Sequence, residues 1–244
     1  IIGIGSGVAF ADSGTPDQQS ALVSAKAPQP WSPQAGDEIR FDVFRQGDKK
    51  FGSHIVKFDS GQDGQLIVTS DVDLKAGLGP ITLFRYSLDS VETWEEDRLV
   101  ALDGQTNDDG DTKRVTASVK GNALEVNGSG YSGEVPLGII PSSHWNIQQV
   151  FSKAILSTEN GEILDTSVTR LGTDTIQING KPVEATHYRL VSDLTVDLWY
   201  DNQNRWGNRL RNNSSKIAKG DENAHQIPAT GCDPTRLQTA EPIA

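Results

Sequence analysis

The sequence predicts an all-β protein whose strands form a single large curled antiparallel sheet, an open or nearly closed barrel with hairpin connections. Three observations support this fold class. Segments across residues 37–206 alternate apolar and polar side chains, which is the two-residue period of a strand with one buried face. Short turns rich in Gly, Asp and Asn separate these segments, as they do in hairpins. The sequence lacks the alternation of strand and helix patterns that builds parallel sheets.

The first half of this region holds a run of expected strands. The segment 37–46 alternates Ile39, Phe41 and Val43 with polar residues. The others share this period, and the longest is long enough for one bent strand or for two: 50–59, 64–75, 81–96, 98–106, 113–120 and 123–128. The acidic stretch 106–111 has the oxygen density of a calcium loop but does not fit the EF-hand template. We therefore interpret it as a hairpin turn.

The second half continues in the same style. Its expected strands are 162–172, 175–180, 181–191, 194–201 and 205–213, and only 146–155 carries a weak helical pattern. So many consecutive strands cannot stay flat, because each strand pair adds right-handed twist. The sheet is therefore expected to curl, with a concave face that encloses either a solid core or a cavity.

The N-terminal residues indicate the cellular location of the protein. Residues 1–11 are apolar, small and uncharged, and they end in the pattern Ala9–Phe10–Ala11. This predicts the remnant of a signal peptide and a periplasmic or secreted protein; a buried first strand is the alternative. The segment is too short to span a bilayer, and we expect no transmembrane segment elsewhere. The single cysteine, Cys232, cannot form an internal disulfide.

Amino-acid composition divides the rest of the chain into a leader, a domain and a tail. Residues 12–36 are rich in Pro, Ser, Gln and Ala and predict a flexible leader, in which Trp31 is placed to pack onto the domain. The β-barrel-like domain covers 37–206. Residues 207–244 form a polar, poorly patterned tail, for which we expect disorder or loose packing from about residue 213.

Charge narrows the range of partners. The net charge is −11 and the isoelectric point is about 4.8. An acidic chain repels phosphate backbones, so nucleic acid is not an expected partner. Solubility alone is the plainer explanation of this charge.

One loop carries candidate catalytic residues. A histidine can act as acid or base near neutral pH, and an asparagine can donate to an oxyanion, which makes His144 and Asn146 the candidates. Ser142 and Ser143 are nearby hydroxyls. The alternatives are contact with a ligand, or a structural corner in which Trp145 plugs the end of the sheet while its neighbours bond loop backbone groups.

Aromatic residues supply the candidate ligand contacts, because they could line a pocket in the concave face: Tyr86, Trp94, Trp145, Trp199 and Tyr200.

The strand DLWYD contains two of these aromatic residues. Its period places Leu198 and Tyr200 toward the interior, and Asp197, Trp199 and Asp201 outward or at a wet mouth. The two carboxylates would lie about 13 Å apart by strand rise, too far for a paired acid–base site. Asp201 is expected to begin a turn.

We expect no metal and no cofactor. The histidines His54, His144, His187 and His225 show neither HxxxH nor HxH spacing. The stretch 128–134 mixes glycine and serine but is not a G-x-S-x-G nucleophile elbow, so we expect a flexible loop there.

Five stretches of the sequence form a distinctive combination: FDVFRQGDKKFGSHIVKF (41–58), LIVTSDVDLK (66–75), ITLFRYSLDSVETWEEDRLVALDGQTNDDGD (81–111), SSHWN (142–146) and HYRLVSDLTVDLWYD (187–201). Together they resemble the uncharacterised exported bacterial proteins of domain-of-unknown-function family 6134. The resemblance implies a secreted all-β open barrel, and it implies no established activity. Members usually continue past the last tryptophan with one more patterned strand, and in this chain that pattern is degraded after Trp206.

These observations favour binding of an apolar or amphipathic small molecule or lipid in the concave face of the sheet. One alternative is an enzyme of hydrolase or lyase type centred on His144. The other is an envelope protein that uses an open sheet edge to bind a partner.

Overall fold

The computed structural model describes residues 28–45, 49–78, 81–178, 181–207 and 240–242. The predicted signal-peptide remnant, most of the predicted leader and most of the tail lie outside these residues. The described chain is all-β, and its helical turns are two short 3₁₀ segments, η1 (Gln62–Gly64) and η2 (Ile147–Phe151). Among the described residues, no helix is long and apolar enough to cross a membrane.

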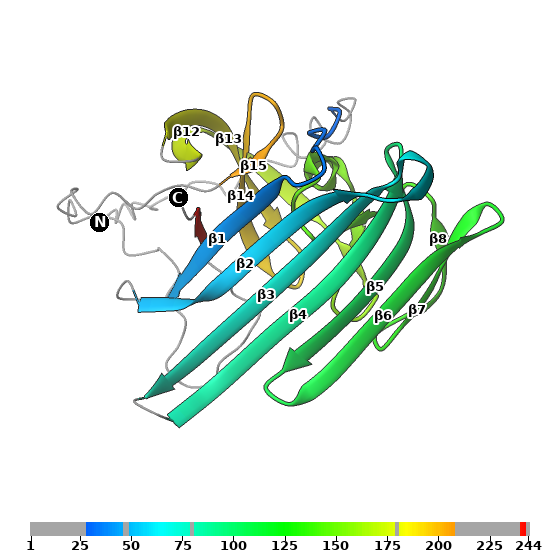
Figure 1. Cartoon of the computed structure of the whole chain (residues 1–244), viewed down its shortest axis with the longest axis horizontal. Coiled ribbons are helices and arrows are strands. Elements are labelled where there is room, and N and C mark those ends of the chain that lie inside the picture. Colours follow the sequence, from blue (N-terminus) through cyan, green and yellow to red (C-terminus); the bar gives the residue numbers. More distant parts are fainter. Residues whose placement is uncertain (1–27, 46–48, 79–80, 179–180, 208–239, 243–244) are drawn as a thin grey trace, which may run out of the picture.

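The first half of the chain forms one large curled sheet (Figure 1). Consecutive strands pair antiparallel as hairpins, and β16 (Ala240–Pro242) joins the sheet beside β1, which gives nine strands in the order β16-β1-β2-β3-β4-β5-β6-β7-β8. The eight that follow one another in sequence are β1 (Glu38–Arg45), β2 (Lys49–Ser60), β3 (Leu66–Leu78), β4 (Ile81–Glu95), β5 (Arg98–Asp108), β6 (Asp111–Lys120), β7 (Ala123–Gly128) and β8 (Ser132–Pro136).

The second half forms two smaller sheets rather than a continuation of the first. A four-stranded antiparallel sheet contains β12 (Ser167–Ile178), β13 (Lys181–Val191), β14 (Thr195–Asp201) and β15 (Trp206–Gly207). A three-stranded sheet contains β9 (Ile140–Pro141), β10 (Ala154–Leu156) and β11 (Ile163–Asp165), and its β9–β10 pair is parallel. The large sheet is not closed into a barrel, so the expected curled, open sheet is confirmed.

The predicted turns form as hairpins. Asp109 and Gly110 connect β5 to β6, and both have positive φ, 51° and 103°. This is the geometry of a two-residue hairpin turn that favours an Asp-Gly pair. The acidic stretch is therefore a turn, as predicted. The helical pattern at 146–155 corresponds to the 3₁₀ turn η2.

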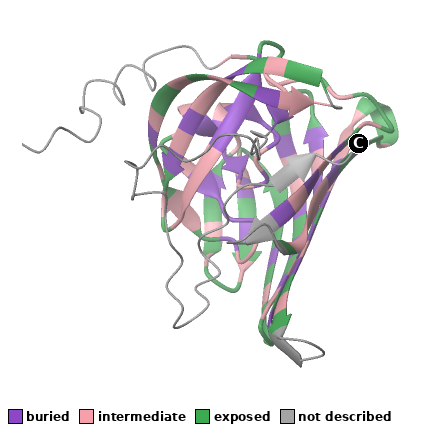
Figure 2. Ribbon diagram, turned by 90° about the vertical axis from the view of Figure 1, so that its left-hand side faces the viewer, coloured by how far each residue is buried: buried purple, intermediate pink, exposed green. Residues whose placement is uncertain are grey.

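One face of each strand is buried. Figure 2 shows buried and exposed residues alternating along the strands, as in β6, where Val115 and Ala117 are buried between exposed neighbours. The main core joins the large sheet to the smaller ones in a single cluster. The aromatic rings at its centre meet edge to face, with centroids 5.2 Å apart for Trp31 and Phe58, 5.5 Å for Phe58 and Trp145, and 5.3 Å for Trp145 and Trp94. Trp31 thus packs onto the domain, as predicted.

Glycines allow one loop to rest against the inside of the sheet. The loop 157–161 approaches β5 so closely that a Cβ atom on Gly104 would lie 2.4 Å from the carbonyl oxygen of Thr158. At Gly128, at the end of β7, a Cβ would lie 2.2 Å from the carbonyl oxygen of Asn160, and the same carbonyl accepts a 2.8 Å hydrogen bond from the amide of Gly130. The expectation of a flexible loop at 128–134 is wrong, because Gly128 and Gly130 hold the loop 157–161 and the chain enters β8 at Ser132.

Candidate functional site

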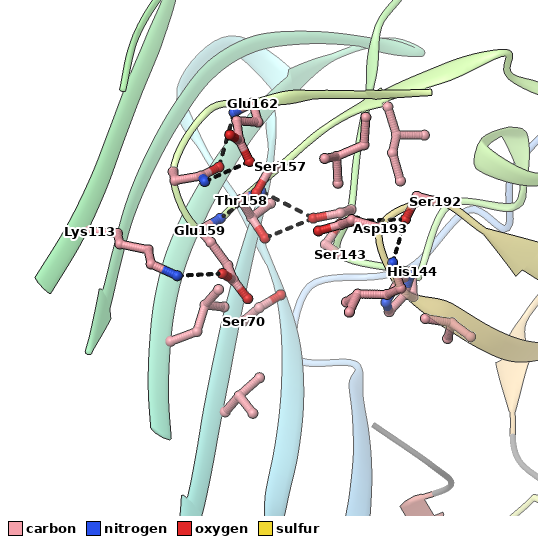
Figure 3. A pocket seen from close by; sticks show the side chains of 18 of the residues that line it. Ser70, Lys113, Ser143, His144, Ser157, Thr158, Glu159, Glu162, Ser192 and Asp193 are labelled. Atoms are coloured by element: carbon pink, nitrogen blue, oxygen red, sulfur yellow. Dashed lines mark hydrogen bonds and ion pairs between the residues drawn. The ribbon is translucent and has the colours of Figure 1, made fainter. Parts of the chain in front are cut away.

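A cavity of about 260 Å³ lies between the concave face of the large sheet and the segments that cover it (Figure 3). Its floor comes from β2, β3, β4, β5 and β6, and its cover from 142–144, 155–164 and the β13–β14 hairpin. This volume lies just below the range of about 300–1,000 Å³ that is typical of small-molecule sites.

Part of the cavity wall is apolar. The aliphatic side chains come from the large sheet, from β10 and β11, and from the β13–β14 hairpin: Val72, Leu88, Ile155, Leu164, Leu190, Leu194 and Val196. Each of them belongs to the inward-facing row of its strand or to the cover. They provide a surface against which a short hydrocarbon group could be buried.

His144 is fixed in the wall by a closed set of hydrogen bonds. Its backbone has φ of 68°, a left-handed conformation that is uncommon outside glycine. The hydroxyl of Tyr200 donates to the carbonyl oxygen of His144 (2.7 Å) and accepts from Nε2 of Gln149 (2.6 Å). Oε1 of Gln149 in turn lies 2.9 Å from Nδ1 of His144. These contacts hold the His144 ring and main chain together.

The direction of these hydrogen bonds sets the tautomer of His144. Tyr200 has one hydroxyl proton, and it is used on the carbonyl of His144, so the amide nitrogen of Gln149 must face Tyr200. The amide oxygen of Gln149 then accepts from Nδ1–H of His144. Burial lowers the pKa of His144, and the hydrogen bond to Gln149 only partly opposes this. The neutral ring therefore keeps Nε2 as a hydrogen-bond acceptor.

His54 on β2 lines the same cavity. Burial, reinforced by the nearby His144, lowers the pKa of His54 to about 3. Its Nε2 is buried and has no hydrogen-bond partner among the described residues. Both rings pack against Trp206, with centroid distances of 5.3 Å for His54 and 5.6 Å for His144. The two histidines are thus neutral polar groups beside a buried tryptophan.

Charged and phenolic groups gather at the other end of the cavity. The hydroxyl of Tyr86 donates a 2.6 Å hydrogen bond to Oε1 of Glu159. Burial raises the pKa of Tyr86, and the charge of Glu159 raises it further, so the phenol keeps its proton. Nζ of Lys113 lies 3.7 Å from Oε2 of Glu159 and 3.5 Å from Oδ2 of Asp108. The ammonium of Lys113 is therefore held between two carboxylates.

Hydroxyl groups lie between these two ends. The Oγ of Ser142 accepts a 3.1 Å hydrogen bond from the amide of Thr158 and lies 3.2 Å from its hydroxyl. Ser70 on β3 is 2% exposed, and its Oγ has no partner among the described residues. Figure 3 shows Ser70 at the cavity with Glu159 and Ser143. Ser70 therefore brings an unsatisfied hydroxyl to the wall, the kind of group that a ligand or water satisfies.

The residues predicted from the sequence do not assemble into one site. His144 and Tyr86 line the cavity. Tyr200 lies behind the wall and positions His144. Asn146 accepts a 3.0 Å hydrogen bond from the amide of Gln148 and caps η2, which is the structural alternative considered for it. Trp199 lies elsewhere, stacked on His187 in the four-stranded sheet with the centroids 4.2 Å apart.

Trp94 and Trp145 meet at a buried carboxylate, and neither is among the residues that line the cavity. Oε2 of Glu92 accepts a 2.8 Å hydrogen bond from the indole of Trp94 and a 3.1 Å hydrogen bond from the indole of Trp145. Glu92 is 0% exposed. Burial raises its pKa, while hydrogen bonds from Ser143, Trp145 and Trp94 oppose this shift. This group holds the segment that contains Trp145 against β4.

The strand DLWYD follows its two-residue period, but the expectation that Trp199 and Asp201 lie outward or at a wet mouth is wrong, because they are only 4% and 5% exposed. Leu198 and Tyr200 face the main core. Trp199 is buried on the other face in a small cluster with Ile176 and Ala185, which come from neighbouring strands of the same sheet. Asp201 accepts from the amides of Gln203 (2.8 Å) and Arg205, as expected for a residue that begins a turn.

Asp197 takes part in a charged cluster on β13 and β14. The guanidinium of Arg189 donates to both of its oxygens at 2.8 Å, and Nε2 of His187 lies 3.5 Å away. Burial alone would raise the pKa of Asp197, but the hydrogen bonds and charges of Arg189 and His187 outweigh burial and hold that pKa well below its ordinary value.

We predict that Asp197→Asn destabilises the protein by about 1 kcal/mol at neutral pH, a value kept small because the pair is partly exposed. A carboxylate with a lowered folded pKa stabilises the fold above its unfolded pKa of about 3.9, and this contribution is lost as the pH falls through the folded pKa. The deficit should therefore shrink on acidification. Urea unfolding between pH 7 and pH 2 measures it, with Asp103→Asn on an exposed position as the control; a deficit that does not change with pH would contradict the prediction.

Sequence reasoning missed most of the cavity wall, although one signal was available. His54 lies in phase with the buried Val56 and Phe58, and Ser70 lies in phase with Val68 and Val72. A polar residue on the apolar row of a strand must face inward. Lys113 and Glu159 carried no comparable signal, because they meet only when the loop 157–161 folds onto the sheet. Within the described residues, no group of three or more His, Cys, Asp or Glu side chains could hold a metal ion.

The fold and the cavity together define an all-β protein with an open curled sheet that encloses a small chamber. A model of the domain of unknown function DUF6134 matches residues 41–214. The chain belongs to this family, which confirms the resemblance seen in the sequence. No curated protein and no solved structure matches the chain significantly.

Proposed function

We propose that the protein binds a small amphipathic molecule in the cavity on the concave face of its large sheet. The observation that carries this proposal is the two-sided lining. Aliphatic side chains such as Leu88 and Leu190 share the wall with two polar atoms that have no partner among the described residues, Oγ of Ser70 and Nε2 of His54. An apolar wall with a few convergent polar groups is typical of small-molecule sites.

The contacts of His144 support binding rather than proton transfer. Its Nδ1 is engaged by Gln149 and its carbonyl oxygen by Tyr200, so the residue shapes the wall and presents one acceptor nitrogen. The volume sets the size of the ligand. A cavity of about 260 Å³ accommodates a short chain or a single ring system rather than a whole phospholipid.

A neutral fluorescent probe tests the proposal. We expect N-phenyl-1-naphthylamine to bind the purified protein with increased fluorescence. We expect Leu88→Trp, which fills the cavity from β4, to weaken this binding by about tenfold, as the loss of about 1.4 kcal/mol would. Val91→Trp is the matched control, because Val91 lies on the same strand, is 42% exposed and points away from the cavity.

A second cavity-filling variant keeps the test valid if Leu88→Trp does not fold. Val196→Trp fills the cavity from the half-buried rim, where the fold tolerates a larger side chain more easily. Circular dichroism and urea unfolding establish that each variant is folded. Equal probe binding by the wild type and both cavity variants would refute the proposal, as would the absence of probe binding to the wild type.

A further inference from the structure

The charge of the cavity lining is strongly one-sided. Its charged groups are the four carboxylates of Asp108, Glu159, Glu162 and Asp193 and the single ammonium of Lys113. Lys113 already lies within 4 Å of two of these carboxylates, so its charge is compensated inside the site. The cavity therefore has an excess of negative charge.

Two of these carboxylates have neutral partners and keep their charge available. Oε2 of Glu162 accepts a 2.9 Å hydrogen bond from the side-chain amide of Asn160. Oδ1 of Asp193 accepts a 2.9 Å hydrogen bond from the hydroxyl of Ser192. Both residues are exposed, which places them at the mouth. They face the solvent through which a ligand would enter.

The histidines do not offset this negative charge. Burial lowers the pKa of both His54 and His144, so both rings are neutral at physiological pH. Nε2 of His144 is an acceptor, because Nδ1–H is committed to Gln149. The histidine side of the wall therefore presents hydrogen-bonding groups without positive charge, so it adds no cation that would pair with an anionic head group.

The buried hydroxyl of Ser70 is independent evidence that the cavity binds a polar group of a ligand. Its side chain is 2% exposed, lines the cavity, and has an Oγ without a partner among the described residues. A buried hydroxyl in this state costs free energy unless a ligand or water completes its hydrogen bonds. Ser70 lies near Glu159 in the cavity (Figure 3), so a ligand group that donates or accepts a hydrogen bond at this point would complete its hydrogen bonds.

We propose that the ligand is a cationic amphiphile, a primary or secondary alkylamine in its ammonium form, whose charged nitrogen pairs with the carboxylates of the cavity while its short chain lies on the aliphatic wall. This inference rests on the proposed function and specifies its ligand class. An ammonium near several carboxylates gains Coulomb energy that a neutral head group does not, and an anion of the same length is repelled.

Three ligands with one tail test the inference: n-octylamine, n-octanol and octanoate. Each is titrated into the protein at pH 7 and low salt, and displacement of N-phenyl-1-naphthylamine gives its affinity. We expect octylamine to bind about tenfold more tightly than octanol, with octanoate weaker than both. Added salt should narrow these differences, because it screens charges at an exposed mouth.

Variants that remove single negative charges test which carboxylates produce the preference for octylamine. Glu162→Gln and Asp193→Asn are at exposed positions, so they should fold normally, and each should reduce the preference for octylamine over octanol several-fold. Glu134→Gln removes the same charge from an exposed position on β8 away from the cavity, and it should leave the preference unchanged.

The outcomes separate the inference from the proposed function. If octanol or octanoate binds as tightly as octylamine, or if the naphthylamine probe binds and octylamine does not, the cationic class is refuted while the binding function stands. If neither the probe nor any of the three ligands binds, the proposed function fails and the inference fails with it. A preference for octylamine that Glu134→Gln reduces as much as Glu162→Gln does would also refute a site at the mouth.

Discussion

Replacing Glu92 by leucine is expected to lower the free energy of unfolding by about 2–6 kcal/mol. The substitution leaves the indole N–H groups of Trp94 and Trp145 without their acceptor. A buried donor without a partner costs about 1–3 kcal/mol, and here two donors depend on one oxygen. Urea unfolding followed by tryptophan fluorescence measures the loss.

Glu92→Gln is the matched variant. The amide oxygen of glutamine can accept from both indoles, so we expect this variant to keep most of the stability that Glu92→Leu loses. If the leucine and glutamine variants were equally stable, the two indole hydrogen bonds would not be what Glu92 contributes.

The stabilities of the wild type and of Glu92→Gln should also depend differently on pH. Burial raises the pKa of Glu92 in the folded protein above its unfolded value of about 4.3. Between these two pKa values the folded state binds the extra proton, so stability falls as the pH rises and is greatest below the unfolded pKa. Glu92→Gln has no such proton, so the stability of the wild type relative to Glu92→Gln should decline across this window; a constant difference would contradict the assignment.

Adding a methyl group at Gly104 is the second change with a large expected effect. The Cβ of Gly104→Ala would lie 2.4 Å from the carbonyl oxygen of Thr158 and 2.9 Å from Cγ1 of Val115. The contact with the Thr158 carbonyl can be relieved only if the loop 157–161 moves off β5. Overpacking of this kind costs about 1–3 kcal/mol. The same movement withdraws Glu159 from Tyr86 and opens the cavity wall, so binding of the naphthylamine probe should fall as well.

Hydrogen exchange shows whether the loop moves. The amide of Gly130 donates to the carbonyl oxygen of Asn160, so it should exchange faster in Gly104→Ala than in the wild type. Gly138→Ala is the control, because nothing lies within 4 Å of a Cβ at that position and its stability should change by no more than about 0.5 kcal/mol. Wild-type stability and unchanged exchange at Gly130 in Gly104→Ala would show that the loop does not depend on this glycine.

Trp145 and Trp199 are candidate ligand contacts in the sequence, because large aromatic side chains could line a pocket in the concave face. Their indole nitrogens instead donate to buried or partly buried carboxylates, Trp145 to Glu92 and Trp199 to Asp174. A tryptophan that finds an acceptor inside the core is indistinguishable in sequence from one that lines a pocket. Which of the two roles the tryptophan has depends on its hydrogen-bond partner, and Glu92 is 53 residues away from Trp145 in the sequence.

Although β8 and β9 were not predicted, the fold class, the family and the positions of most strands and turns follow from the sequence alone. These follow from local rules, since the two-residue period and Asp-Gly turns act over a few residues. The cavity was decided by the tertiary structure. Tyr86 meets Glu159 across 73 residues, and Gly104 receives Thr158 because a loop from another part of the chain lies on it. Such contacts depend on how the sheet curls and what then covers its hollow, which a period along one strand does not encode.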